Sequence, residues 1–374
     1  MRIVIDARMY FESGIGRYVR NLLTNLQKLD NKNEYFVLHP IAQYDRLVYR
    51  TNFQKVLADF KWYGVKEQIE LPKILNKLKP DIVHFPHFNI SLAYGGKFVV
   101  TIHDLIHQHY SMSRATTLGP ITYKIKQLGY KNIFKKAITK SEKILVPSKY
   151  VRDLLVGEWN VNPEKVVVTY EAVDDKMFTI VKKMNILESS SILKKFGIHQ
   201  PYIFYIGNAH PHKNIDGLIK AFLALKENYK DLQLVLSGND NYFWQKIKNE
   251  NNNKNIFFTG LVTDEELVSL YKNAEAFVMP SFEEGFGIPI LEAMAIGCPV
   301  VSSNAGALPE VGEDAAIYFD PKSPDDMESK ISMVLEDESL IKDLILKGVK
   351  RVKNFSWEKL AKQTLEVYKR CALQ

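Results

Sequence analysis

The chain has 374 residues, of which 46% are hydrophobic and 25% charged, and its formal net charge is +7 at pH 7. This composition is ordinary for a globular protein, and the length predicts two domains because a single core seldom grows this large. Two cysteines, Cys298 and Cys371, cannot form a disulfide framework, and the chain shows neither a signal-peptide pattern nor an apolar run of roughly 20 residues, so we expect a cytoplasmic protein.

A glycine-containing loop follows the first apolar run of the chain. Residues 3–5 predict a buried strand, and a helix with apolar residues at helical spacing is expected over about 17–29. Gly14 and Gly16 lie between them, where glycine lets backbone amides approach a phosphate. They do not complete the Gly-x-Gly-x-x-Gly dinucleotide fingerprint, so the pattern does not favour a dehydrogenase.

Strand and helix patterns alternate along the rest of the chain, which predicts parallel sheets with helices on both faces. The first series of strands is expected at 35–38, 82–85, 98–102, 143–146 and 166–168. The alternation is lost over 178–191, which we interpret as a linker. A second series is expected at 202–206, 233–236, 256–259, 276–279, 300–302 and 317–319. The sequence therefore predicts two doubly wound α/β domains, at 1–177 and 192–356.

Positive charge is concentrated in residues 118–150. This stretch has eight lysines and one acidic residue, Glu142, so its net charge equals that of the whole chain. Nucleic acid binding would need a recognisable motif or interleaved aromatic residues, and neither is present. We therefore expect no nucleic acid partner and favour contact with an anionic membrane surface, at the inner face of the cell membrane. The alternative is a solvated helix face.

Two candidate functional residues follow expected strands. His103 ends the strand at 98–102 and is followed by Asp104, which could orient the imidazole ring or cap the next segment. A histidine in this position is more often structural than catalytic. Lys213 lies at a loop–helix junction after the first strand of the second series, where its charge would face a cleft.

The most informative stretch is residues 279–292, with the sequence MPSFEEGFGIPILE. An apolar run ends at its first proline, so a strand should stop there, and Gly285 and Gly287 allow a tight bend near a ligand. A helix should begin around the second proline, and its exposed amides suit an anionic ligand. Glu284 precedes this helix and Glu292 lies about one turn inside it, so both carboxylates can face one cleft. The alternative is a solvated loop with a surface glutamate.

The spacing of Glu284 and Glu292, with Gly-Phe-Gly-x-Pro between them, resembles the signature of the retaining nucleotide-sugar glycosyltransferases of family 4. Further stretches resemble the same family: Gly-Ile-Gly-Arg-Tyr at 14–18, Gly-Cys-Pro-Val-Val at 297–301 and Ala-Gly-Ala-Leu-Pro-Glu at 305–310. The resemblance implies the GT-B architecture, in which two Rossmann-like doubly wound domains face a cleft. It also implies that a C-terminal helix over 357–374 crosses back to the N-terminal acceptor domain.

The resemblance implies roles for the residues that match the family motifs. Lys213 would hold the donor diphosphate and stabilise the leaving group, Glu292 would bind the ribose, and Glu284 would hold sugar hydroxyls. His103 would lie beside the donor sugar. His212 occupies a position that is often arginine in the family, which lowers the positive charge expected at the diphosphate.

The resemblance thus implies a catalytic set and a donor-binding set. The catalytic residues are expected to be His103, Lys213 and Glu284. The donor-binding residues are expected to be Gly14, Gly16, His212, Lys213, Val262, Glu284, Gly285, Phe286, Gly287, Ile288 and Glu292. The loop that holds Val262 would cradle the base, and an aspartate there could accept hydrogen bonds from guanine. Helix capping by Thr263 or Asp264 is the stronger interpretation of that loop.

The implied reaction transfers a hexose, with retention, from a nucleoside diphosphate sugar to a hydroxyl of a glycan or lipid-linked glycan in bacterial surface polysaccharide synthesis. GDP-mannose is the favoured donor and a UDP-hexose the second. We expect no cofactor and no metal ion, since the chain has no Asp-x-Asp motif.

Other interpretations remain open. A sugar-nucleotide epimerase could use the same architecture, and a glycan-binding protein without catalytic activity is a second alternative. A metal site is a further, disfavoured interpretation of the seven histidines that follow expected strands: His84, His87, His103, His107, His109, His210 and His212.

Overall fold

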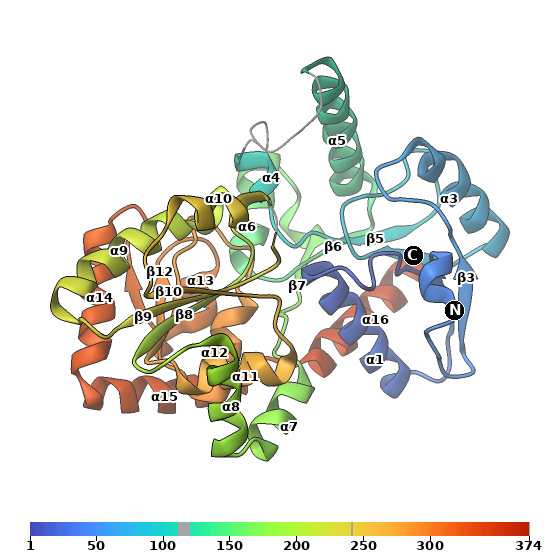
Figure 1. Ribbon diagram of the computed structural model, residues 1–374. Helices are drawn as coiled ribbons and strands as arrows, with labels where there is room; N and C mark the ends of the chain where they lie inside the picture. The colour runs from blue at the N-terminus through green and yellow to red at the C-terminus, as the bar shows by residue number, and fades with distance from the viewer. Residues whose placement is uncertain (111–119, 241, 374) are drawn as a thin grey trace. The chain divides into compact units, whose positions relative to one another are not determined.

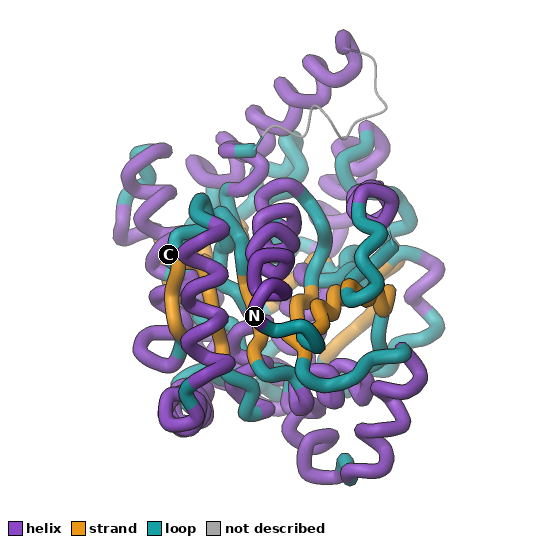
Figure 2. Tube along the Cα trace, turned by 60° about the vertical axis from the view of Figure 1, so that its left-hand side comes forward, coloured by secondary structure: helices purple, strands orange, loops and turns teal. Residues whose placement is uncertain are grey.

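The computed structural model describes residues 1–110, 120–240 and 242–373, with only the backbone described over 120–127. The chain divides into two compact units (Figure 1). The N-terminal unit comprises Met1–Glu171 together with Ser356–Gln374, and the C-terminal unit comprises Ala172–Phe355. Each unit contains a parallel sheet whose strands are enclosed by helices (Figure 2), as expected for parallel sheets, which need both faces covered. The prediction of two doubly wound α/β units is confirmed.

The sheet of the N-terminal unit has the strand order β3-β2-β1-β4-β5-β6-β7. Its strands are β1 Arg2–Asp6, β2 Glu34–His39, β3 Phe53–Leu57, β4 Ile82–Phe85, β5 Phe98–Thr101, β6 Lys143–Val146 and β7 Val166–Val168. The chain enters at β1, builds outward to β3, and then returns to pair β4 on the other side of β1. The order therefore reverses between β1 and β4, which creates a switch point at their carboxyl ends.

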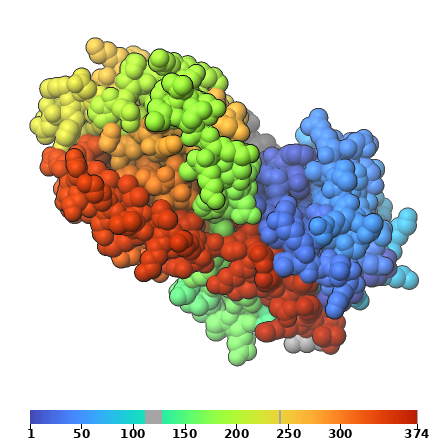
Figure 3. Space-filling view, turned by 90° about the horizontal axis from the view of Figure 1, so that it is seen from below, coloured from blue at the N-terminus to red at the C-terminus, as the bar shows by residue number. Residues whose placement is uncertain are grey.

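The helices of the N-terminal unit include one from the far end of the chain. They are α1 Gly14–Leu29, α2 Ile41–Tyr44, α3 Val65–Leu78, α4 Ile106–His109, α5 Pro120–Lys140, α6 Lys149–Trp159 and α16 Trp357–Leu373. Helix α16 packs against α1, so that the C-terminal residues lie against the N-terminal ones (Figure 3). The hydroxyl of Tyr368 on α16 also hydrogen-bonds Nδ1 of His84 on β4, at 2.5 Å. The return of the last helix to the N-terminal unit is confirmed.

Helix α5 carries part of the basic stretch at 118–150. Residues 118–119 and the side chains of 120–127 lie outside the described residues. Along the described part, Ile133, Phe134, Ala137 and Ile138 are buried in the core of the N-terminal unit. The helix therefore uses its apolar side for packing. No helix within the described residues is long and apolar enough to cross a membrane.

The sheet of the C-terminal unit has the strand order β10-β9-β8-β11-β12-β13. Its strands are β8 Tyr202–Ile206, β9 Gln233–Ser237, β10 Ile256–Gly260, β11 Ala276–Met279, β12 Val300–Ser303 and β13 Ile317–Phe319. Its helices are α7 Asp175–Lys183, α8 Ile186–Phe196, α9 Ile215–Asn228, α10 Tyr242–Glu250, α11 Asp264–Asn273, α12 Ile288–Ile296, α13 Leu308–Gly312, α14 Pro324–Glu336 and α15 Glu338–Val352. Here the order reverses between β8 and β11, both of which pair in parallel.

Residues 178–191, interpreted from the sequence as a linker, are instead helical. They fall largely within α7 and α8, which both pack against α11 of the C-terminal unit. Asn185 and Glu188 form a capping box that starts α8. Because the interpretation followed only the strand–helix alternation, it missed this Asn-x-x-Glu signal, which is a sequence mark of a helix N-terminus.

Candidate functional site

The switch point of the C-terminal unit brings together the two most distinctive predicted residues. Lys213 ends a short 3₁₀ turn after β8, and Glu284 lies in the loop after β11. In open parallel sheets, ligands bind outside the carboxyl ends of the two strands where the order reverses. β8 and β11 are those two strands, so the fold gives both residues the position of a ligand site.

Lys213 and Glu284 form an ion pair. The Nζ of Lys213 donates to Oε1 of Glu284 at 2.6 Å, and the two side chains are 14% and 9% exposed. The hydroxyl of Ser281 donates to the same carboxylate oxygen at 2.6 Å. A buried charge is tolerated only when it is paired and hydrogen-bonded. The ion pair with Lys213 and the hydrogen bond from Ser281 meet this requirement and hold the carboxylate in place.

The loop after β12 supports the backbone of Glu284. A Cβ atom added to Gly306 would lie 2.6 Å from the Glu284 nitrogen and 2.7 Å from its carbonyl oxygen, and the φ of Gly306 is +63°. The amide of Ala307 donates to that carbonyl at 3.0 Å. Only glycine fits this close approach. The Ala-Gly-Ala segment, noted in the sequence only as a family pattern, therefore holds Glu284 in place.

Helix α12 begins as expected from the sequence, beside Glu284. Gly287 is its N-cap, with φ +99°, and a proline lies in the first turn. A Cβ atom on Gly287 would come within 2.5 Å of a Leu308 side-chain carbon, which would have to shift, and the positive φ favours glycine in its own right. The amides at this end of a nine-residue helix form a positive end that suits an anion. The preceding residues of the donor-binding set, Gly285 and Phe286, are buried.

Glu292 lies inside α12 and is only 2% exposed. The hydroxyl of Tyr271, on α11, donates to its Oε2 at 3.2 Å and contacts the Pro289 carbonyl at 3.3 Å. The structure thus places Glu292 on the helix that starts at the switch point, as the spacing predicted. Tyr271, which orients this carboxylate, was not singled out from the sequence.

The turn that carries Lys213 is fixed by its neighbours. Asn214 has φ +56°, and its side-chain amide donates to the carbonyls of Pro280 at 3.1 Å and Pro321 at 2.8 Å. The carbonyl of His212 accepts from the Phe282 amide at 2.7 Å. These bonds tie the loop after β8 to the loop after β11. His212 itself is buried and its ring stacks on His210.

The loop that holds Val262 starts α11. Thr263 is the N-cap, and its side chain forms a capping box with Glu266. Asp264 pairs with Lys176 at 2.5 Å. The capping interpretation of this loop is confirmed, and both polar residues already have protein partners. Val262, half-buried, precedes the cap.

In the N-terminal unit, His103 follows β5 with both ring nitrogens engaged. Nδ1 lies 3.0 Å from a carboxylate oxygen of Glu171, and Nε2 lies 3.0 Å from the Pro86 carbonyl. Since both partners are acceptors, these contacts favour the doubly protonated ring, in which both nitrogens donate. Burial alone would lower the pKa of His103, but the hydrogen bond and charge of Glu171 outweigh it and raise the pKa.

This pair predicts a pH dependence of stability. The folded-state pKa of His103 is raised, so its contribution to stability should be complete below the ordinary histidine pKa and lost as the pH rises through the folded-state value. Glu171→Gln should remove this contribution. Urea unfolding of the wild type and of Glu171→Gln across pH 5 to 9 would test this prediction. The control is Glu158→Gln, which removes the carboxylate that pairs with His109 at the surface. Parallel curves for wild type and Glu171→Gln would contradict the assignment.

The two glycines of the first loop differ in their surroundings. Helix α1 begins at Gly14, three residues earlier than expected, so both lie in its first turn. A Cβ on Gly16 would lie 2.6 Å from the Tyr10 carbonyl, so close packing of its own loop requires glycine there. Gly14 has no atom within 4 Å of such a Cβ. Close backbone packing thus explains Gly16, and open space surrounds Gly14.

The histidines of the N-terminal unit have structural partners. His84 is fully buried between Tyr368 and Thr101, and burial lowers its pKa to about 3. Asp104 accepts from the Ile106 amide at 3.0 Å, so it caps the next segment, one of the two roles expected for it. Within the described residues, no group of three or more His, Cys, Asp or Glu side chains could hold a metal ion.

Two family models match the chain, one in each half. Residues 13–176 match Glycosyltransferase Family 4, and residues 189–351 match Glycosyl transferases group 1. The O-antigen chain mannosyltransferase B of Escherichia coli is 33% identical over 378 residues, which cover 96% of each chain. The O-antigen chain mannosyltransferase RfbU of Salmonella typhimurium is 25% identical, covering 86% of this chain and 87% of its own.

Solved structures show the same fold. The HepE protein of Anabaena, solved in a complex with UDP-glucose, superposes with a TM-score of 0.76 over 99% of this chain and all of that one. Its sequence is only 15% identical, so this likeness shows the fold alone. The identity and coverage of the Escherichia coli relative show the family. The chain therefore belongs to the family 4 glycosyltransferases, with the GT-B fold of two Rossmann-like domains.

Proposed function

We propose that this glycosyltransferase moves mannose from GDP-mannose to a hydroxyl of a glycan or lipid-linked glycan in bacterial surface polysaccharide synthesis. The observation that carries the proposal is the buried Lys213–Glu284 pair at the switch point of the C-terminal unit, beside the start of α12. Mannose is favoured because the two relatives described above are named as O-antigen mannosyltransferases. A UDP-hexose is the second candidate donor, since the HepE structure contains UDP-glucose.

In the proposed mechanism, the diphosphate lies against Lys213 and the amides at the start of α12. Both supply positive charge where the leaving group becomes more negative. The acceptor oxygen bonds to the anomeric carbon as that carbon's bond to the phosphate oxygen breaks. Attack comes from the leaving-group side, and the departing phosphate oxygen takes the acceptor proton. This path retains the anomeric configuration.

Glu284 is proposed to hold sugar hydroxyls rather than to act as a nucleophile. Its Oε1 already accepts from Lys213 and Ser281, both at 2.6 Å. These bonds draw electron density from the carboxylate and occupy the acceptor sites of Oε1, which makes the group a weaker nucleophile. We assign His103 a role in positioning the donor sugar. Its two ring nitrogens already contact Glu171 and the Pro86 carbonyl, which hold the ring in place.

A thermal-shift screen tests the choice of donor. A ligand at a hundred times its dissociation constant stabilises the folded state by about 2.7 kcal/mol. GDP and GDP-mannose should raise the melting temperature more than UDP and UDP-glucose do. A larger shift with the UDP ligands would reverse the donor assignment, and no shift with any of the four would overturn it.

Incubation with GDP-mannose alone separates a transferase from an epimerase. The proposed enzyme should leave the free sugar nucleotide unepimerised and should consume it faster when an octyl glycoside acceptor is added. EDTA should leave this rate unchanged, since Lys213 and the start of α12 are proposed to balance the diphosphate charge. Conversion of GDP-mannose to another GDP-sugar without acceptor would favour the epimerase.

We also propose that the exposed lysines of the basic stretch contact an anionic membrane. Lys131, Lys135 and Lys140 are exposed on α5, whereas Lys136 is held by the carbonyls of Leu92 and Tyr94. The apolar side of α5 is buried in the core, so the contact would be electrostatic.

Vesicle sedimentation tests this contact. Each lysine near an anionic surface contributes about 1 kcal/mol, so changing Lys131, Lys135 and Lys140 to glutamate should abolish most binding to phosphatidylglycerol vesicles. Added salt should weaken the binding of the wild type. The matched control changes three exposed lysines of the C-terminal unit to glutamate: Lys342, Lys350 and Lys353. Equal losses in both triple variants would show that only total charge matters.

A further inference from the structure

The switch point of the N-terminal unit carries a second buried polar cluster, which the donor site does not use. Arg8 follows β1, and Asn89 follows β4, the two strands between which the order reverses. Their side chains are 2% and 3% exposed. The cluster therefore occupies the same position in its own sheet as Lys213 and Glu284 do in theirs, where an open parallel sheet binds a ligand.

The guanidinium of Arg8 is locked in place. Its Nε donates to Asp6 at 2.8 Å, and its Nη2 donates to both Asp6 and Glu67, each at 2.6 Å. The ring of Phe60 covers the guanidinium at 4.9 Å. A buried arginine with two carboxylates keeps one orientation, because any rotation would leave charges unpaired.

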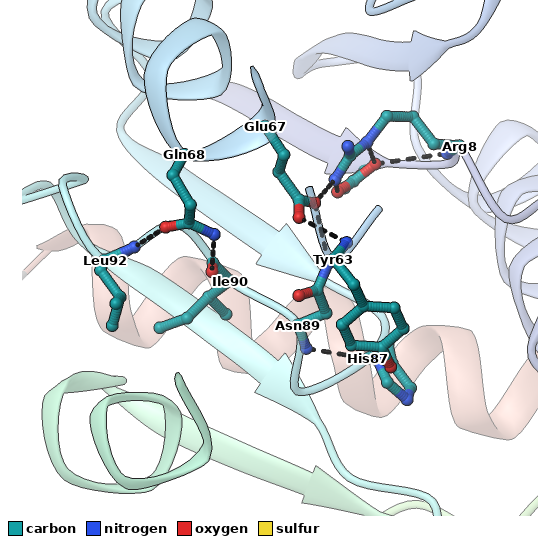
Figure 4. Close-up of polar contacts among 9 residues, drawn as sticks. Arg8, Tyr63, Glu67, Gln68, His87, Asn89, Ile90 and Leu92 are labelled. Atoms are coloured by element: carbon teal, nitrogen blue, oxygen red, sulfur yellow. Dashed lines mark hydrogen bonds and ion pairs between the residues drawn. The ribbon is translucent and has the colours of Figure 1, made fainter. Parts of the chain in front are cut away.

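Glu67 extends the lock to Asn89 and the neighbouring loop (Figure 4). Its Oε1 accepts from the Asn89 amide nitrogen at 2.7 Å, and its Oε2 accepts from the Tyr63 backbone at 2.9 Å. Tyr63 has φ +61°, an unusual conformation for a residue with a side chain. One carboxylate from α3 thus sets the orientation of Arg8, of Asn89 and of the loop next to Trp62.

Two polar atoms of this cluster are left over. Nη1 of Arg8 and Oδ1 of Asn89 are buried and have no hydrogen-bond partner among the described residues. Arg8 and Asn89 both line a cavity of about 10 Å³, with Trp62 and Ile15 among its apolar walls. That volume fits one water-sized group. A single group that both accepts and donates would satisfy this buried donor and this buried acceptor.

We propose that this cavity binds a hydroxyl group of the acceptor sugar, with Arg8 Nη1 donating to the hydroxyl and Asn89 Oδ1 accepting from it. A hydroxyl both accepts and donates. A cation is disfavoured because it would face the positively charged side chain of Arg8. A phosphate is disfavoured because the carboxylates of Asp6 and Glu67 outnumber the single positive charge of Arg8. The half-buried indole of Trp62 gives the sugar ring an apolar face, as small-molecule sites typically combine aromatic walls with few polar groups.

The sugar is assigned to the acceptor because Lys213, Glu284 and Glu292, the main donor contacts, belong to the C-terminal unit. The residues of the N-terminal unit expected near the donor, Gly14, Gly16 and His103, do not line this cavity. This step rests on the proposed transfer reaction. Binding of a hydroxyl at Arg8 and Asn89 rests only on the cluster itself.

The test measures glycoside binding to the full chain by saturation-transfer NMR. The probes are the methyl α-glycosides of mannose, glucose, galactose and N-acetylglucosamine, with inorganic phosphate as a competitor. At least one glycoside should bind, and phosphate should not displace it. Arg8→Lys, which keeps the charge but lacks Nη1, should weaken binding about tenfold, as expected for a lost hydrogen bond to a charged group. Asn89→Ala, which should also weaken binding, carries the test if Arg8→Lys does not fold.

A matched control separates ligand contact from loop displacement. Gln68, next to Glu67 on α3, bonds the carbonyl of Ile90 and the amide of Leu92 and does not line the cavity. Gln68→Ala should loosen the same loop and leave glycoside binding within about twofold of wild type, since no hydrogen bond to the ligand is lost. In addition, the glycoside should change the tryptophan fluorescence of the wild type, and Trp62→Phe should abolish that change.

The outcomes distinguish this inference from the proposed function. Binding of no glycoside, displacement by phosphate, or an equal loss in Gln68→Ala and Asn89→Ala would overturn the hydroxyl site. GDP binding, measured by calorimetry on the same protein, tests the donor site independently. Glycoside binding that depends on Asn89 but comes without binding of either GDP or UDP would overturn the proposed transfer reaction and leave the hydroxyl site standing.

Discussion

Replacing Lys213 by alanine should lower turnover by roughly a hundredfold or more, because the lysine is proposed to stabilise the charge that grows on the leaving diphosphate. The effect on donor binding should be smaller, since the charge is only partly developed in the ground state. Steady-state rates with GDP-mannose, together with calorimetry for GDP, would separate the two effects. A variant with normal turnover would remove Lys213 from the mechanism.

The ion pair complicates this variant, because Lys213→Ala leaves Glu284 buried without its partner. Breaking a buried pair costs about 3–5 kcal/mol of stability. The double variant Lys213→Ala with Glu284→Gln removes both charges and should recover most of that stability without recovering turnover. Lys220→Ala, at an exposed position on α9, is the control and should match the wild type. Recovery of turnover in the double variant would show that the loss reflected misfolding.

Replacing Glu292 by glutamine should weaken donor binding by roughly tenfold to a hundredfold. A hydrogen bond to a charged group is worth about 1.5–3 kcal/mol, and the carboxylate is proposed to receive the ribose hydroxyls. Tyr271→Phe should give a smaller loss, because it removes the hydroxyl that orients this carboxylate at 3.2 Å. Calorimetry with GDP measures both.

Glu265→Gln, at an exposed site on α11, is the control for the change from glutamate to glutamine. It should bind GDP like the wild type. If Glu292→Gln also binds GDP like the wild type, the ribose contact lies elsewhere. A loss of GDP binding in Glu265→Gln would instead point to a long-range charge effect.

Much of the fold could be predicted because buried parallel strands read as short apolar runs. β4, β6 and β8 were predicted at their observed bounds. β3 was missed because it is an edge strand whose residues, including Gln54 and Lys55, are mostly partly or fully exposed. Edge strands lack the continuous apolar pattern of central ones, so the sequence carried too weak a signal.

The structure surrounds the motif residues with partners that no linear pattern reveals. Glu171 lies 68 residues from His103, and Glu67 lies 59 residues from Arg8. These contacts depend on which strands become neighbours, and strand order cannot be read from spacing along the chain. Arg8 was passed over for the same reason: a single arginine after a strand is ordinary until the distant residues Glu67 and Asn89 are found in the same buried cluster.

The anomeric configuration of the product is the most direct test of the proposed reaction. Proton NMR, recorded as the enzyme acts on GDP-mannose with an octyl glycoside acceptor, should show a new mannosyl signal with the α configuration of the donor. The same experiment on the slow hydrolysis of GDP-mannose should show α-mannose as the first product, before it equilibrates in water. Formation of β-mannose or a β-mannoside would contradict the proposed retaining transfer.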